Sequence, residues 1–307
     1  MYYVLGNRPR TERIGVLPGI AENFMSRRTI LNEIKCEGVA LHAGSQVHMT
    51  LGPARGGSGI VFRRSDLGGR EIRASWDKVT ETKLGTVIAD ASGMSVGVIE
   101  YLMAAVAGAE VDDLAVTLDG PEPPILDGDA LSFLDLLEEA RFHESLVVRR
   151  GVRVLKPIKV EREGAFAALE PADDRILEFD IQFDSPAIGK QRLAFVFTPG
   201  RFRMEIAPAR TFGFLSELDA LNKVGLAKGA SLENTLAIEG DTIVNAERMR
   251  FADEFVRHKI LDAMGDLALA GGPLIGRFVG HRSGHALNNA LLRTLFADAA
   301  NFAWVEI

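Results

Sequence analysis

The side chains best suited to chemistry lie on one predicted helix over residues 253–270. His258, Asp262 and Asp266 are spaced at i, i+4 and i+8, so a helix places an imidazole and two carboxylates in one stripe. Apolar residues fall on the opposite side of that helix. Such a stripe is typical of a metal site or of general acid–base catalysis. Because His-x-x-x-Asp also arises by chance, a solvated helix face is the alternative.

Three further segments carry side chains of the same kinds. Glu100 interrupts an apolar helix, where a carboxylate is either paired with a cation or kept for function, while core packing alone explains its neighbour Tyr101. His285 follows a glycine at a predicted strand–helix junction, where it either approaches a substrate or caps the helix. Thr211 offers a hydroxyl beside two phenylalanines, which suits a ligand contact or a buried turn.

Short strands and five longer helices are predicted to position these segments. We expect strands at residues 46–51, 60–62, 71–74, 114–118, 152–160, 165–169, 176–183 and 192–197, and helices at residues 96–109, 131–140, 215–224, 253–270 and 285–299. The short turns favour mostly antiparallel pairing in the second half. Strands and helices follow in a similar order in each half, and one helix of each half ends in Ala-Gly. The pattern predicts an α+β fold made of a duplicated unit.

The chain is predicted to divide into a tail and two domains. Residues 1–25 mix Gly, Pro and charge without periodicity and are expected to form an N-terminal tail. Residues 26–146 form the first expected α+β domain and residues 147–307 the second.

The composition excludes several classes of protein. With 47% apolar and 25% charged residues the chain has an ordinary globular composition, and a net charge of −7 argues against a general nucleic-acid partner. The single cysteine, Cys36, excludes an intrachain disulfide and a cysteine-type zinc site, so a metal must use His, Asp or Glu. No uncharged apolar run reaches the ~18 residues of a membrane span, and no signal peptide is recognisable. We therefore expect a cytoplasmic protein without a transmembrane segment.

Six segments together resemble one known family. In order along the chain they are NEIKCEGVALHAG, SVGVIEYLMAA, DGPEPPILDG, ARTFGF, DEFVRHKILDAMGDL and SGHALNN. On these motifs the chain is identified as a member, or a divergent paralogue, of the zinc-dependent UDP-3-O-acyl-N-acetylglucosamine deacetylases of lipid A synthesis. The resemblance runs from Thr29 to Trp304. It implies two similar domains of layered strands and helices, with the active site between them.

The resemblance also implies a Zn²⁺ cofactor. The family holds zinc with two histidines and one aspartate, and His258 and Asp262 match two of these positions. The third family ligand is the histidine of a Glu-His-Leu-Met-Ala-Ala segment, and here that position is Tyr101. A phenol has an ordinary pKa near ~10 and is a poor ligand at neutral pH, so weak or partial zinc occupancy is expected.

The remaining roles follow from the same resemblance. Glu100 matches the general base, and His285 matches the group that protonates the leaving amine. The positions matched to supporting catalytic groups are Lys259, Asp266 and Thr211, and those matched to substrate contacts are Phe212, Arg282 and His42. The implied reaction converts a UDP-acyl-sugar to acetate and a free amine, and the protein is expected to be a monomer.

Tyr101 leaves three interpretations open. The first is a working deacetylase in which the tyrosine is a weak or displaced ligand. The second is a metal-poor paralogue that binds a sugar nucleotide or an acyl ligand with little turnover. The third is a hydrolase with another substrate. The other matched positions, which are all retained, favour the first interpretation.

Overall fold

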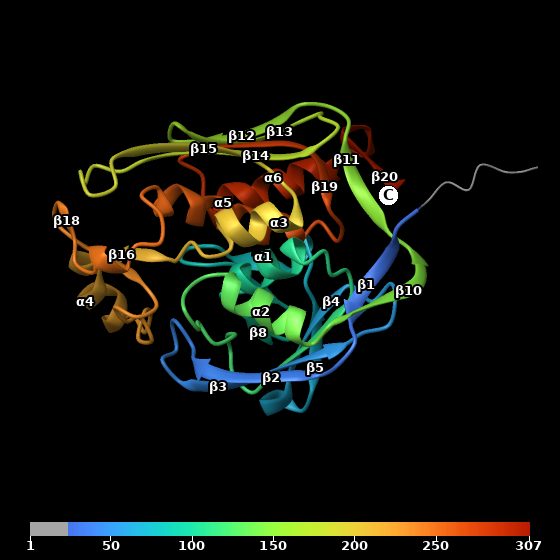
Figure 1. The fold of residues 1–307 in the computed structure, drawn as a ribbon, viewed down its shortest axis with the longest axis horizontal. Coiled ribbons are helices and arrows are strands. Elements are labelled where there is room, and N and C mark those ends of the chain that lie inside the picture. The colour runs from blue at the N-terminus through green and yellow to red at the C-terminus, as the bar shows by residue number, and fades with distance from the viewer. Residues whose placement is uncertain (1–23) are drawn as a thin grey trace, which may run out of the picture.

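The computed structural model describes residues 24–307 and places most of the helices between two β-sheets (Figure 1). The lower, five-stranded sheet has the order β2-β3-β9-β4-β5. Its strands are β2 (Ile34–Val39), β3 (Gln46–Pro53), β4 (Ile60–Arg64), β5 (Arg70–Arg73) and β9 (Leu114–Leu118). The alternation predicted for β3 is confirmed, because Val47, Met49 and Leu51 are buried on one face.

The upper sheet has seven strands from the second half of the chain. They are β11 (Arg150–Val154), β12 (Ile158–Arg162), β13 (Ala165–Glu170), β14 (Arg175–Gln182), β15 (Lys190–Val196), β19 (Leu274–His281) and β20 (Phe302–Glu306). Most pairs are antiparallel, as expected, but β19 runs parallel to both β11 and β14. The single strand predicted over residues 152–160 is wrong. The chain breaks into β11 and β12 around Pro157, which has no N–H for a sheet ladder.

Six α-helices are assigned in the described part of the chain. They are α1 (Glu100–Gly108), α2 (Leu131–Glu139), α3 (Pro199–Arg201), α4 (Leu215–Lys223), α5 (Glu254–Ala268) and α6 (His285–Ala297). The helix predicted from residue 96 begins four residues late, because Ser95 and Val96 pair in a strand and Val98 has a φ of 52°. The α+β class is confirmed.

Smaller elements complete the structure. They are the strands β1 (Ser26–Ile30), β6 (Val79–Glu81), β7 (Val87–Ala89), β8 (Ser95–Val96), β10 (Phe142–Val148), β16 (Phe212–Phe214), β17 (Leu236–Glu239) and β18 (Thr242–Ile243). Strand β10 pairs with β1 and continues across residue 146, so no break in the chain marks the predicted domain boundary. That boundary stays a prediction. The predicted tail lies outside the described residues except for Phe24 and Met25.

Helices α1 and α5 cross at the centre of the molecule and bring the two halves together (Figure 1). Gly265 allows this close approach, since a Cβ there would overlap the Glu100 carbonyl oxygen. The crossing therefore fixes the start of α1 against the middle of α5, where the chemically interesting side chains lie.

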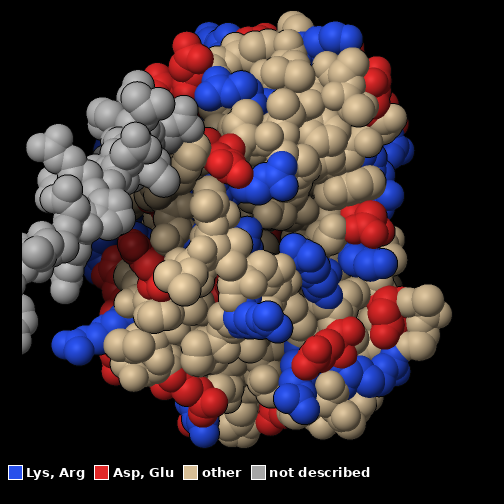
Figure 2. Space-filling view, turned by 90° about the vertical axis from the view of Figure 1, so that its right-hand side faces the viewer, with Lys and Arg blue, Asp and Glu red and all other residues tan. Residues whose placement is uncertain are grey.

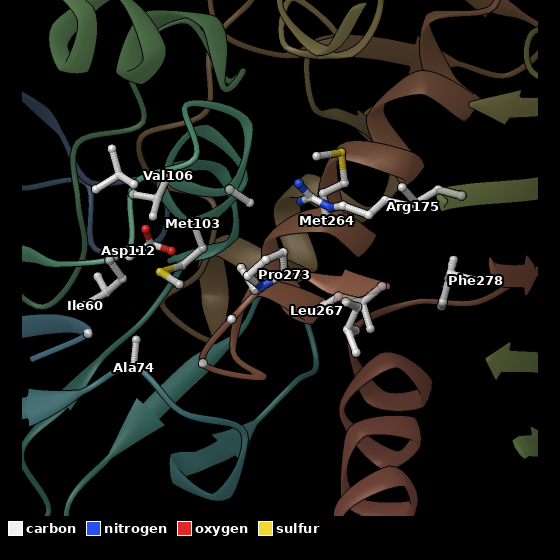
Figure 3. A pocket seen from close by; sticks show the side chains of 18 of the residues that line it. Ile60, Ala74, Met103, Val106, Asp112, Arg175, Met264, Leu267, Pro273 and Phe278 are labelled. Atoms are coloured by element: carbon white, nitrogen blue, oxygen red, sulfur yellow. The ribbon is translucent and has the colours of Figure 1, made fainter. Parts of the chain in front are cut away.

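A small cavity of about 90 Å³ lies in the seam between the halves. Figure 3 shows Met103 and Val106 of α1 on one side of it and Met264 of α5 and Arg175 on another. The nearby cations are paired: the Arg149 guanidinium lies 2.9 Å from Asp112 and 3.0 Å from Glu110, and Arg175 lies 3.4 Å from Glu110. The seam is thus held by charge as well as by apolar packing.

The surface carries charges of both signs. On the face drawn in Figure 2, Lys and Arg are interspersed with Asp and Glu and form no continuous basic field. Within residues 24–307, none of the helices combines the length and the apolar character needed to cross a membrane.

Candidate active site

A cavity of about 770 Å³ gathers the predicted site residues. All of them line it except Asp266, which lies behind His285. The walls come from the start of α1, one side of α5, the start of α6, and the segment β16–α4. The cavity therefore receives side chains from both halves of the chain, as the resemblance implies.

The polar stripe of α5 is buried. His258, Asp262 and Asp266 are only 3%, 4% and 2% exposed, so the alternative of a solvated helix face is wrong. Buried ionisable groups require partners or a function, because removing charge from water is costly. The contacts of these side chains divide the stripe into two parts. His258 and Asp262 face each other, and Asp266 pairs with His285.

His258 and Asp262 are arranged as two metal ligands would be. The His258 Nδ1–H donates to the Ala209 carbonyl oxygen at 3.0 Å, which leaves the lone pair on Nε2. That Nε2 lies 3.3 Å from Asp262 Oδ1, a buried atom without a hydrogen-bond partner among the described residues. Two ligands of a tetrahedral zinc ion are separated by roughly 3.3–3.5 Å, so this pair fits. Burial lowers the pKa of His258, against the opposing charge of Asp262, which favours the neutral ligand form.

Tyr101 does not complete a three-ligand site. Burial, followed by the charges of Glu100 and Asp262, raises the pKa of its phenol well above the ordinary value. The ring centre of this neutral phenol lies 5.4 Å from that of His258. Nowhere in residues 24–307 do three His, Cys, Asp or Glu side chains form a group able to hold a metal. The residues fit a metal with two protein ligands.

Lys259 keeps Asp262 ionised. Its Nζ lies 2.7 Å from Asp262 Oδ2, the oxygen that does not face His258. Burial raises the pKa of Asp262, but neighbouring cations, above all the Lys259 ammonium group, outweigh it and lower the value to about 2. One carboxylate oxygen is thus neutralised by the lysine while the other faces the imidazole.

Glu100 is a buried carboxyl group at the start of the apolar helix α1. It is 1% exposed, and burial raises the pKa of its carboxyl group to about 7. The Thr86 N–H donates to Glu100 Oε2 at 2.9 Å. Gly85 lies against the other oxygen; its φ is 144°, and a Cβ there would approach Glu100 Oε1 to 2.9 Å. Glu100 therefore has a fixed orientation and a pKa close to neutrality.

His285 and Asp266 form a second pair. The His285 Nδ1–H donates to Asp266 Oδ2 at 2.9 Å from the first turn of α6. Burial lowers the pKa of His285, but the charge and hydrogen bond of Asp266 outweigh it and raise the value to about 9. Asn288 also donates to Asp266, at 2.8 Å. The imidazole is therefore protonated at neutral pH and suited to donate a proton.

The segment around Thr211 leads into strand β16 and reaches the cavity. Arg210 does not enter the cavity, because its Nε donates to Glu254 at the start of α5, at 3.0 Å. The Thr211 N–H donates to Gly128 and its carbonyl accepts from Leu236, both at 2.8 Å. The alternative of a buried turn is wrong, because Phe212–Phe214 form strand β16 and Thr211 is only partly buried, and the residue lines the cavity.

The three predicted substrate contacts lie at different depths. Phe212 packs edge-on against Phe255, 5.0 Å between ring centres, and lines the cavity. Arg282 is exposed at the cavity edge. His42 bridges two loops: its Nε2–H donates to Leu84 O at 2.8 Å, and its Nδ1 accepts from Ala227 N at 3.3 Å.

Two features of the site cannot be recognised from the sequence motifs. Thr86 is a single threonine in a loop, and nothing in its spacing relates it to Glu100 or Asp266. The apolar face of α4, which carries Leu215, Leu218 and Leu221 into the cavity, has helical periodicity but was not linked to the site.

A buried base, an imidazole–carboxylate pair with two free ligand atoms, and a protonated histidine around one cavity define an enzyme that hydrolyses its substrate. The family model described as UDP-3-O-acyl N-acetylglycosamine deacetylase matches residues 27–297. The chain belongs to this family.

Relatives named UDP-3-O-acyl-N-acetylglucosamine deacetylase agree with the family match. The protein of Phenylobacterium zucineum is 45% identical over 89% of this chain and 94% of its own length. That of Acidithiobacillus ferrooxidans is 44% identical over 92% of this chain and 94% of its own. That of Neisseria gonorrhoeae is 39% identical over the same shares. The similarity therefore covers nearly all of the described residues.

Proposed function

We propose that this chain hydrolyses the N-acetyl group of UDP-3-O-acyl-N-acetylglucosamine to give acetate and a free amine. Family membership and deacetylase relatives similar over most of both chains support this reaction. The observation that carries it is the grouping of Glu100, the His258–Asp262 pair and the His285–Asp266 pair around one cavity. The comparisons give no support to a non-catalytic paralogue.

Proton transfer is divided between two side chains in this proposal. Glu100 accepts a proton from the attacking water, which suits a carboxyl group whose pKa is about 7. His285 donates a proton to the departing nitrogen, which suits an imidazole whose pKa is about 9. Asp266 holds the imidazole in position through its 2.9 Å bond to Nδ1.

The family is generally zinc-dependent, and we propose that His258 and Asp262 hold the ion here. When bound, zinc would polarise the acetamide carbonyl and lower the pKa of the attacking water. Lys259 keeps Asp262 ionised for this role. The hydroxyl groups of Thr211 and Tyr101 lie beside the site and can donate to the oxygen that becomes negative as the carbonyl is attacked.

The cavity has an apolar side and a basic edge that match the two ends of the substrate. The apolar side, where we place the acyl chain, is formed by Phe212, Phe214, Leu215, Leu218, Leu221 and Leu232. Besides Lys259, which pairs with Asp262, the cations at its lining are Lys83, Arg162 and Arg282, and we place the diphosphate at these three. The cytoplasmic location and monomeric state stay predictions.

The reaction is tested by zinc content and deacetylation in three proteins. Tyr101→His restores an imidazole at the third ligand position and should raise zinc affinity at least about 10–100-fold, with a parallel gain in turnover. Tyr101→Phe is the matched control, because it keeps the ring without providing a ligand, and it should gain neither. If Tyr101→His binds zinc stoichiometrically and still leaves the UDP-acyl-sugar intact, the proposed reaction is rejected.

A further inference from the structure

Thr86 lies between the two carboxylates that serve the proposed proton transfers. Its backbone N–H donates to Glu100 Oε2 at 2.9 Å, and its hydroxyl donates to Asp266 Oδ1 at 2.5 Å. Glu100 begins α1 in the first half of the chain, while Asp266 is on α5 in the second. One residue thus bonds to both carboxylates and joins the two halves at the site.

The backbone of Thr86 is fixed against α1 on both sides. Besides the N–H bond to Glu100, its carbonyl oxygen accepts from the Ile99 N–H at 3.4 Å. The preceding Gly85 packs against the Glu100 carboxylate and cannot accept a Cβ without displacing it. Thr86 is 2% exposed. The contacts with α1 therefore fix the position of the Thr86 hydroxyl, and the hydroxyl in turn fixes Asp266 through its hydrogen bond.

The Thr86 hydroxyl is the nearest hydrogen-bond donor to one of the two carboxylate oxygens of Asp266. Asn288 Nδ2 and His285 Nδ1 donate to Oδ2 at 2.8 and 2.9 Å. Oδ1 receives the Thr86 hydroxyl and a longer contact of 3.2 Å from the His285 ring. Without the Thr86 hydroxyl, the buried Oδ1 would keep only the His285 ring as a hydrogen-bond donor. We therefore expect the ring to turn toward Oδ1.

We propose that Thr86 is a positioning residue that keeps Glu100 and the Asp266–His285 pair in register. This inference rests on the proposed function. The two groups act on the attacking water and on the departing nitrogen of the same carbonyl carbon, where a misplacement of about 1 Å can cost about 100-fold in rate. Thr86 does not line the substrate cavity, so its loss is expected to lower kcat and leave KM nearly unchanged.

The test compares Thr86→Val with Thr86→Ser, in the natural chain and in Tyr101→His. Valine keeps the shape and the backbone bonds but removes the hydroxyl, and kcat should fall about 10–100-fold. Serine restores the hydroxyl and should recover most of the activity. Thr29→Val is the matched control, because Thr29 is a buried threonine whose hydroxyl accepts from the Ala54 N–H and does not line the cavity, and kcat should not change.

A second measurement separates this inference from the proposed reaction. Imidazole ¹⁵N and N–H signals of His285, recorded at one pH, should shift in Thr86→Val and stay in place in Thr86→Ser and Thr29→Val. Should Thr86→Val not fold, Thr86→Ala takes its place in both measurements. Unchanged His285 signals, a serine variant as slow as valine, or a loss confined to KM would each overturn the positioning role. If the natural chain and Tyr101→His both leave the substrate intact, the reaction is rejected and the His285 signals alone decide the role of Thr86.

Discussion

The proton-transfer groups of the site are tuned by burial in opposite ways. Burial is the largest influence on Glu100, and it raises the pKa of the carboxyl group to about 7. In His285 burial acts to lower the pKa, but the adjacent Asp266 carboxylate outweighs it and the value is about 9. The base is thus deprotonated and the acid protonated together between these two values.

The expected result is a bell-shaped dependence of kcat/KM on pH. Activity rises through about pH 7 as Glu100 loses its proton and falls above about pH 9 as His285 loses its own. A bound cation stabilises the Glu100 carboxylate, so zinc loading should move the acidic limb to lower pH. Steady-state rates from pH 5 to pH 10 measure both limbs.

Two variants show which side chain causes each limb of the pH profile. Glu100→Gln should abolish turnover without releasing metal, because the glutamine keeps the shape of the side chain but cannot accept the proton. His285→Gln should lower the rate and remove the alkaline limb. An alkaline limb that survives in His285→Gln would mean that another group donates the proton.

The polar stripe of α5 is the part of the candidate site that the sequence predicts best. The spacing of His258, Asp262 and Asp266 predicts one helical stripe, and the structure shows that stripe. Its division into a ligand pair and a histidine–aspartate pair depends on contacts with Ala209 and His285, which are distant in sequence. Thr86 was missed for the same reason, since its two partners come from different helices.

At the scale of elements, the crossing of α1 and α5 sets the distance between Glu100 and the His258–Asp262 pair. Gly265 is the residue at the contact, and its missing side chain lets the α1 backbone approach. Lys259 and Asp262 lie on the same helix within two turns of it. A change in this spacing therefore acts on stability and on the site together.

Gly265→Ala is expected to destabilise the fold by about 1–3 kcal/mol, because the added methyl group forces the helices apart. Turnover should fall as well, since Glu100 moves with α1. Chemical denaturation gives the first quantity and steady-state kinetics the second. Gly200→Ala is the control, because a Cβ at residue 200 meets nothing within 4 Å, and it should change neither. Equal effects of the two substitutions would show that helix spacing is not the cause.

Elements with a clear hydrophobic periodicity are predicted well from the sequence. The residues at which they begin and end are predicted less well. The period of residues 253–270 predicts α5 to within two residues at each end. The start of α1 was placed too early because Val96 fits the apolar pattern although it belongs to a strand. The pairing of β19 with both β11 and β14 follows from contacts across the whole second half, which no local pattern encodes.

At the scale of the whole molecule, a buried charge cluster ties the two halves together. The side chain of Arg149 is 5% exposed and bonds to Asp112 and Glu110 just beyond α1. Its backbone also bonds to Met25 and Ile307, both within 3.1 Å. Arg149 is therefore a junction between the first half, the second sheet and the β1–β10 ribbon.

Arg149→Met should lower the free energy of unfolding by about 3–5 kcal/mol, because it leaves two carboxylates in the seam with less compensation. Arg203→Met is the control, since Arg203 and its partners Asp135 and Glu138 are each about half exposed, and its loss should cost less than about 1 kcal/mol. Denaturant titration of both variants gives the comparison. A similar small loss in both would show that the seam depends on apolar packing alone.

Strand order in the second sheet has a consequence for how the protein is made. Strand β11 lies between β19 and β20, so Arg150 finds its partner only in Glu306. The first sheet, by contrast, has all its strands once residue 118 has been synthesised. Since chains fold from the N-terminus as they leave the ribosome, the edge of β11 that pairs with β20 stays unpaired until translation reaches residue 306. That interval, rather than the finished structure, is when the nascent chain is most exposed to aggregation and most in need of chaperones.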